Sequence, residues 1–241
     1  MERIIFKRTA ETRCGSTTAS EAALLYPSYV DLDPFIDVAQ LKSLNLYIRE
    51  RLERRLAGAR DLAFYTGPFL LDGRQPHLPG SRLVYLTRSV GPENYYDLDR
   101  TDLWAPSEDA EEFAELTAFI ATLPFQATGR IIIMYDDSGR AVSAHRDHES
   151  ADLCHEFIWF RTNFAKPFYM LEPKTGEKLY VASHSAWFDT VNQFHGADAA
   201  SGLSFSIRVD GRFSDSFRRR IPVPERGRAA APALWASSAM R

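Results

Sequence analysis

The first half of the chain carries apolar residues at helical spacing in two segments. Residues 34–58 repeat an apolar residue every three or four positions, with Lys, Arg and Glu between them, which predicts an amphipathic helix. A second helix is predicted from Ser107, a capping residue followed by acids, to about residue 123. Residues 61–71 and 81–89 predict strands, separated by a loop rich in Gly, Pro and His. The first half is therefore expected to be an α/β elaboration.

From Gly129 the pattern changes to short apolar runs separated by turn residues. Residues 130–135 predict a strand, Asp136-Asp137-Ser138-Gly139 predicts a hairpin turn, and residues 141–147 predict the returning strand. Further short strands are predicted near 155–163, 167–172, 178–183, 186–194 and 203–210. Many short strands at intervals of about 8–12 residues indicate a sandwich or barrel. The expected fold class is mainly β with flanking helices.

The chain length of 241 residues fits one domain with additions. We expect a single domain over residues 1–222, made of an N-terminal elaboration (1–128) and a β core (129–222). Residues 223–241 are rich in Ala, Pro and Ser without periodicity, which predicts a flexible tail.

Charge and composition limit the kinds of binding partner and the cellular compartment that we expect for this protein. The net charge of −3 argues against a broad nucleic-acid surface. No apolar run approaches the roughly 18 residues that span a membrane, and the N-terminus lacks the apolar stretch of a signal peptide. Only two cysteines, Cys14 and Cys154, are present, so a reducing cytoplasm is expected. The oligomeric state is left open by the sequence.

Chemistry-bearing residues gather in the β-rich half. Residues i and i+2 of a strand share a side, so His145 and Asp147 are expected to face one point while Arg146 faces away. His195 would join them from a distant strand, with Gly196 marking that strand's end. Two histidines and one carboxylate are the ligands of a facial non-haem Fe(II) site. Taken singly, each histidine is better explained as an ordinary polar residue, and only the joint pattern of these residues favours a metal site.

Thirteen positions after His195, the predicted strand 203–210 carries Arg208. Ser204, Ser206 and Arg208 share one face of this strand, and the opposite face is apolar. The polar face either meets solvent or lines a cavity that holds an anion, and the upstream histidines favour the cavity. A buried Arg could clamp a carboxylate in a bidentate, charge-assisted pair, with the Ser206 hydroxyl beside it.

Two further residues are candidate contacts to a substrate or co-substrate. Arg161 and Asn163 share a face of the strand predicted near 155–163. A salt bridge at the rim of the barrel is the alternative for Arg161.

Together, His145-Arg146-Asp147, His195 and Arg208 resemble the Fe(II)/2-oxoglutarate-dependent dioxygenases over roughly residues 129–212. Residues 185–195 and 206–211 look most like the aspartyl/asparaginyl β-hydroxylase branch. The resemblance implies a double-stranded β-helix (jelly roll) with Fe(II) held by His145, Asp147 and His195, 2-oxoglutarate held by Arg208 and Ser206, and O₂ as oxidant. It further implies hydroxylation of an unactivated C–H bond in a small molecule, an amino acid or a derivative of one, with release of succinate and CO₂.

Two alternatives stay open on the same residues. One is a cupin-like isomerase or hydrolase that uses Zn or Mn and consumes no O₂. The other is a non-catalytic β-barrel binding module whose histidines are structural.

Overall fold

The computed structural model describes residues 6–7, 28–57, 81–90, 101–147, 156–190 and 193–221. The strands that precede the β core are β1 (Phe6–Lys7), β2 (Tyr29–Asp31), β3 (Ser81–Tyr85), β4 (Thr87–Ser89) and β5 (Trp104–Pro106). The strands of the core are β6 (Phe125–Asp136), β7 (Val142–His145), β8 (Phe157–Phe160), β9 (Phe168–Leu171), β10 (Lys178–Tyr180), β11 (Ser185–Trp187), β12 (Phe194–Ala197) and β13 (Ser204–Phe213). The helices are η2 (Asp33–Phe35), α1 (Val38–Ala57), η4 (Thr101–Leu103), α2 (Asp109–Glu112), α3 (Ala114–Ile120) and α4 (Asp215–Arg218).

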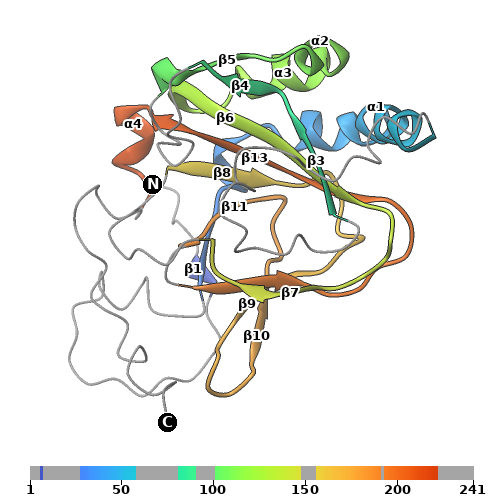
Figure 1. The fold of residues 1–241 in the computed structure, drawn as a ribbon. Coiled ribbons are helices and arrows are strands. Elements are labelled where there is room, and N and C mark those ends of the chain that lie inside the picture. Colours follow the sequence, from blue (N-terminus) through green and yellow to red (C-terminus); the bar gives the residue numbers. More distant parts are fainter. Residues whose placement is uncertain are drawn as a thin grey trace.

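Two antiparallel sheets face each other (Figure 1). The larger has seven strands in the order β1-β2-β11-β8-β13-β6-β3, and the smaller has four in the order β10-β9-β12-β7. Strands β4 and β5 form a separate pair. The long strands β6 and β13 are neighbours in the interior of the larger sheet and pair along most of their length.

The pairing of the eight strands β6–β13 is that of a jelly roll. Counted from β6 as first, the larger sheet pairs first with eighth, eighth with third and third with sixth. The smaller sheet pairs second with seventh, seventh with fourth and fourth with fifth. This nested order is the double-stranded β-helix, so the expected fold class is confirmed by the strand register of the chain itself.

The predicted hairpin at residues 136–139 is wrong. β6 and β7 lie in different sheets, so this turn carries the chain across the sandwich instead of returning it beside itself. Gly139 takes a φ of +69° in the turn. Turn residues alone signal a reversal of the chain, but the pairing partner depends on strands far away in sequence, here β12 and β13.

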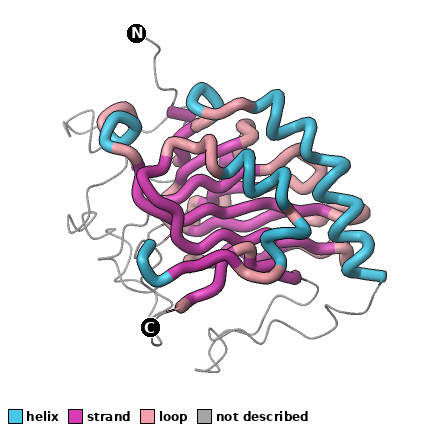
Figure 2. The backbone as a smooth tube through the Cα atoms, turned by 90° about the horizontal axis from the view of Figure 1, so that it is seen from above, coloured by secondary structure: helices cyan, strands magenta, loops and turns pink. Residues whose placement is uncertain are grey.

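Helices α1, α2 and α3 lie on the outer face of the larger sheet, opposite the smaller sheet (Figures 1 and 2). Helix α1 begins after Asp37, whose carboxylate accepts the Gln40 N–H at 2.9 Å and so caps the first turn. Its predicted apolar face is buried in the core: Leu41, Leu44, Ile48 and Leu52. None of the helices in the described ranges is long and apolar enough to cross a bilayer.

Several predicted boundaries differ from the structure. The helix predicted from Ser107 is two helices, α2 and α3, separated at Phe113. The strand predicted over 81–89 is likewise two, β3 and β4, and the strand predicted over 186–194 is two, β11 and β12, in different sheets. The strand predicted over 61–71 and the tail 223–241 lie outside the described residues.

Candidate metal centre

The smaller sheet brings His145 and His195 together. The two residues are direct partners on β7 and β12, and their ring centroids lie 4.5 Å apart. The sequence indicated that Gly196 ends its strand, but the structure places it inside β12. A Cβ at Gly196 would lie 2.7 Å from both the Tyr169 Oη and the Val142 carbonyl oxygen. The glycine therefore lets β7 and β9 approach β12 closely beside the two histidines.

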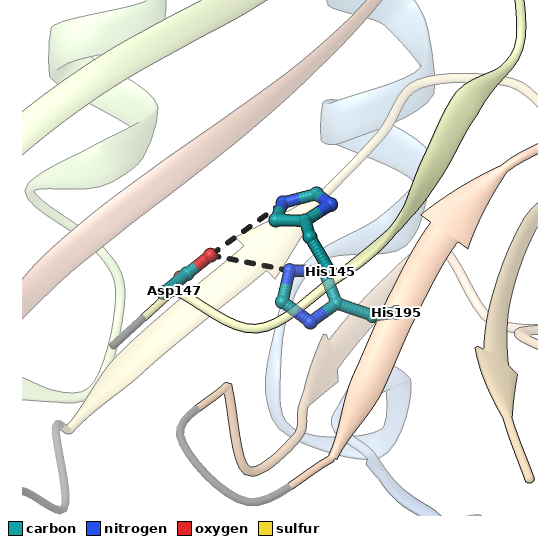
Figure 3. Close-up of side chains that lie close together, drawn as sticks. All are labelled: His145, Asp147 and His195. Carbon is teal, nitrogen blue, oxygen red and sulfur yellow. Dashed lines mark ion pairs between the residues drawn. The ribbon is translucent and has the colours of Figure 1, made fainter. Parts of the chain in front are cut away.

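Asp147 completes the cluster from the loop that follows β7. Its backbone N–H donates to the Thr190 carbonyl at 2.9 Å, which fixes the loop beside the residues that precede β12. Its Oδ1 lies 3.2 Å from His195 Nε2 and 3.7 Å from His145 Nε2, and Figure 3 shows the three side chains facing one another. Their ligand atoms all lie within 4.8 Å of one another. Two ligand atoms that bind one metal ion at right angles, each at about 2.1 Å, lie about 3 Å apart, so the cluster has the dimensions of a metal site.

Backbone carbonyls orient both imidazoles. His145 Nδ1 lies 2.8 Å from the Ser143 carbonyl oxygen, and His195 Nδ1 lies 3.3 Å from that of Gln193. A carbonyl only accepts, so each Nδ1 carries the proton and donates it. Each Nε2 is thereby turned toward Asp147, the orientation in which histidines commonly bind a metal.

The charge states of the cluster also suit a metal. Burial lowers the pKa of the His145 imidazole, and His195 beside it lowers it further. Burial alone would raise the pKa of the Asp147 carboxyl, but His195, Arg208 and His145 outweigh burial and hold that pKa well below its usual range. A neutral imidazole and an ionised carboxylate are the forms that bind a divalent cation.

Arg208 contacts this cluster directly, which the sequence did not predict. Its Nη1 donates to Asp147 Oδ2 at 2.7 Å and its Nε donates to Asp210 Oδ1 at 2.8 Å. Arg130 Nε donates to the other oxygen of Asp210 at 2.9 Å. The guanidinium of Arg208 also lies over the Phe157 ring, 4.1 Å from its centroid. Asp147, which is half-buried, and the buried residues Arg208, Asp210 and Arg130 thus form a chain of alternating charge.

Asp210 and Arg130 are the members of this chain that sequence reasoning missed. The alternation on β13 already placed Asp210 on the polar face, two residues after Arg208. Arg130 carried no signal of its own, because only the pairing of β6 with β13 brings it to Asp210.

A cavity of about 460 Å³ extends from the cluster between the two sheets. Aromatic rings line it on the side of His195, where Phe188 and Phe168 lie 5.3 Å and 5.9 Å from the imidazole centroid. A volume of this size accommodates small organic ligands. Phe188 is buried and also lines this cavity.

The remaining candidate residues all line the cavity. Ser206 and Arg208 face it from β13, while Ile207 and Val209 pack into the core on the other side of the strand. Arg161 lines it as a buried residue, which replaces the alternative of a rim salt bridge. Asn163 lines it too and donates to Asn45 Oδ1 at 2.7 Å. Their roles toward a ligand stay predictions.

No protein-family model and no curated protein matches the chain. The chain is similar to a solved prolyl-4-hydroxylase of Pseudomonas putida, with a TM-score of 0.40 and 11% identity over 75% of this chain and 89% of that one. It is also similar to a prolyl hydroxylase of Trichoplax adhaerens, solved with a hypoxia inducible factor peptide fragment, with a TM-score of 0.42 and 11% identity over 75% and 80% of the two chains.

A third similar structure is an oxidoreductase of the 2OG-Fe(II) oxygenase family from Burkholderia pseudomallei, with a TM-score of 0.34 and 10% identity over 72% of this chain and 89% of that one. At this level of overlap and identity, the jelly-roll assignment rests on the strand pairing of this chain, and its function is inferred from its own side chains.

Proposed function

We propose that this protein is an Fe(II)- and 2-oxoglutarate-dependent oxygenase that hydroxylates a small molecule, an amino acid or a derivative of one. The observation that carries the proposal is the cluster of His145, Asp147 and His195 beside a cavity lined by buried cations. Two imidazoles and one carboxylate leave coordination positions open, which is the donor set of non-haem iron oxygenases.

The residues present fit both the metal and the co-substrate. Asp147 offers one oxygen toward the two imidazoles, because Arg208 holds the other. Two buried nitrogen atoms near the cavity, Arg208 Nη2 and Arg161 Nε, have no hydrogen-bond partner within the described residues. A dicarboxylate co-substrate would satisfy such donors, and Ser206 offers a hydroxyl beside Arg208.

In this proposal each part of the site has a separate task. His145, Asp147 and His195 would hold the iron, which when bound supplies activation of O₂ coupled to decarboxylation of the 2-oxo acid. Arg208, Ser206, Arg161 and Asn163 are the proposed contacts to co-substrate and substrate. The aromatic wall of Trp159, Phe168 and Phe188 would limit water in the cavity.

We further propose that residues 1–222 act as one unit. Strand β2 extends the larger sheet beside β11, and β3 extends it beside β6. Helix α1 packs its apolar face into the same core. The N-terminal elaboration therefore continues the sheet that carries Arg208.

The experiment that tests the function measures succinate formed from 2-oxoglutarate under air, with Fe(II) and ascorbate, across a panel of free amino acids. Stimulation of succinate by one of them, lost in the His195→Ala variant, supports the proposal and identifies the substrate class. In another outcome, the anaerobic protein shows an Fe(II)–2-oxoglutarate absorbance band while no amino acid stimulates turnover. That result would support 2-oxoglutarate as the co-substrate and refute the amino acids of the panel as substrates. Stoichiometric Zn or Mn without any such band would favour the cupin-like enzyme, and no metal at all would favour the binding module.

A further inference from the structure

The two sides of the cavity beside the metal cluster differ in character. On one side, the cations Arg161, which follows β8, and Lys166, which lies between β8 and β9, line the cavity. On the other side the lining residues are aliphatic: Leu83 on β3, Met134 on β6 and Val142 on β7. The strand order β8-β13-β6-β3 separates Arg161 from Leu83 by three strand spacings, which amount to about 14 Å. The cavity therefore has a cationic side and an aliphatic side.

The aliphatic side chains come from neighbouring positions on each of the two sheets. On the larger sheet, Leu83 is the direct partner of Met134, and Met134 is the direct partner of Ser206. On the smaller sheet, Val142 is the direct partner of Ala197, which also lines the cavity. Both sheets thus present an aliphatic pair to the same cavity, and these four residues (Leu83, Met134, Val142 and Ala197) are called the aliphatic subsite below.

The aliphatic subsite lies a short step along the strands from the metal cluster. On β12, Ala197 follows His195 by two residues. On β13, Ser206, the partner of Met134, lies two residues before Arg208, which contacts the metal cluster. Two residues along a strand correspond to about 7 Å. A substrate whose reacting carbon lies at the metal cluster can therefore extend a chain of a few carbon atoms into the subsite.

The side chains of the subsite are not part of the main hydrophobic core. Among the described residues, Leu83, Val142 and Ala197 are neither in that core nor packed against it, whereas Met134 packs against it. Leu83, Met134 and Val142 are half-buried. An alkyl group that covers such side chains removes apolar surface from water, which is favourable. A charged group placed there would lose hydration without gaining a polar partner from these four residues.

We propose that the aliphatic subsite binds the alkyl side chain of the substrate, which is a neutral amino acid with an aliphatic side chain. This inference rests on the proposed function, since it takes the ligand of the cavity to be the amino acid that is oxidised. It narrows that function, because acidic, basic and hydroxylated side chains do not complement an aliphatic wall.

The test measures how affinity depends on the length of the amino-acid side chain. Anaerobic calorimetry gives the dissociation constants of L-alanine, L-2-aminobutyrate, L-norvaline and L-norleucine with the protein loaded with Fe(II) and 2-oxoglutarate. The wild-type protein is expected to bind about fourfold more tightly for each added methylene group. L-Homoserine carries a hydroxyl in place of the terminal methyl group of norvaline, and it is expected to bind about 10-fold more weakly than norvaline.

Three variants test whether the aliphatic subsite causes this dependence. Leu83→Ser should bind norleucine about 5- to 10-fold more weakly than the wild type while it binds alanine equally well. Ala197→Leu fills the subsite, so it should weaken norleucine more than alanine and shift the preference to shorter side chains. Leu46→Ser serves as a matched control, because Leu46 on α1 is 63% exposed. It should keep the dependence of the wild type.

The absorbance band of 2-oxoglutarate on the iron separates failure of the inference from failure of the proposed function. With the band present, equal affinities along the series, no binding of any member, or homoserine bound as tightly as norvaline would overturn the inference alone. A length dependence that is the same in Leu83→Ser, Ala197→Leu and the control would also overturn it, because the alkyl group would then bind elsewhere. Without the band in the wild-type protein, the proposed function fails, and the inference fails with it.

Discussion

Arg208 and Asp147 share a 2.7 Å hydrogen bond from Nη1 to Oδ2, which leaves Oδ1 of the same carboxylate for the two histidines. The carboxylate is therefore oriented to offer a single oxygen to a metal. Asp210 is fully buried and holds Arg208 in turn, and Arg130 holds Asp210. Through these contacts, β6 and β13 of the larger sheet hold Asp147, which lies in the loop after β7 of the smaller sheet.

Replacing Arg208 by Met should weaken metal binding by about 10- to 100-fold, the usual effect of losing a partner that orients a ligand. The variant also removes a cation from Asp210, so the free energy of unfolding should fall by about 3 kcal/mol. Metal affinity can be measured by competition with a chromophoric chelator, and stability by urea unfolding. An unchanged metal affinity in a folded Arg208→Met protein would show that Arg208 does not orient Asp147.

Removing a metal-binding side chain should reduce the affinity for the metal more than it reduces the stability of the fold. The Asp147→Ala and His195→Ala variants are expected to bind Fe(II) below the level measurable by anaerobic titration, and to form no succinate, because two protein ligands hold the ion too weakly. Asp215→Ala is the control, because Asp215 is an exposed acid on α4. Stoichiometric iron in both ligand variants would place the metal elsewhere.

Gly196→Ala should disturb the cluster through the backbone. The new Cβ would clash with the Val142 carbonyl, which belongs to the neighbouring strand and cannot rotate away. We expect a loss of about 1–3 kcal/mol in unfolding free energy together with weaker metal binding, because β7 carries His145. Gly176→Ala is a useful comparison: a Cβ there meets nothing within 4 Å, and only its φ of +73° opposes the change. That variant should bind metal normally, and equal metal loss in both would refute a local effect at Gly196.

The Asp136–Lys166 pair should stabilise the protein in a manner that depends on pH. Burial alone would raise the pKa of the Asp136 carboxyl, but hydrogen bonds from Lys166 and Ser138 outweigh burial and lower that pKa. A carboxyl whose pKa is lower in the folded protein contributes stability above the pKa of the unfolded chain, near 3.8, and loses it as the pH falls through the folded value.

Asp136→Asn should therefore lower the free energy of unfolding at pH 7 by about 1–3 kcal/mol, from the loss of hydrogen bonds to a charged group. The difference between variant and wild type should stay constant down to about pH 5 and shrink below about pH 4. Urea unfolding over this pH range measures it. A difference that grows on acidification would contradict the assigned direction of the shift.

The sequence by itself determined the elements whose signal is local. The three- and four-residue spacing from Leu41 to Leu52 specified the buried face of α1, and the alternation around Arg208 specified which side chains of β13 leave the core. The spacing of short strands indicated a sandwich or barrel, and the His145-x-Asp147 pair with His195 indicated a metal site. The buried helix face, the strand alternation and the shared side of His145 and Asp147 follow from helix and strand periodicity, which a single segment displays.

Only the tertiary structure decided what depends on pairing between distant segments. It sent β6 and β7 to different sheets, placed Gly196 inside a strand, and brought Arg208 against Asp147 and Asp210. It also separated the cations of the cavity into two that are paired with carboxylates and Arg161, whose contacts are neutral carbonyls. The charge environment of a side chain is set by neighbours from other strands, and register between strands is a property of the folded sheet that no single segment carries.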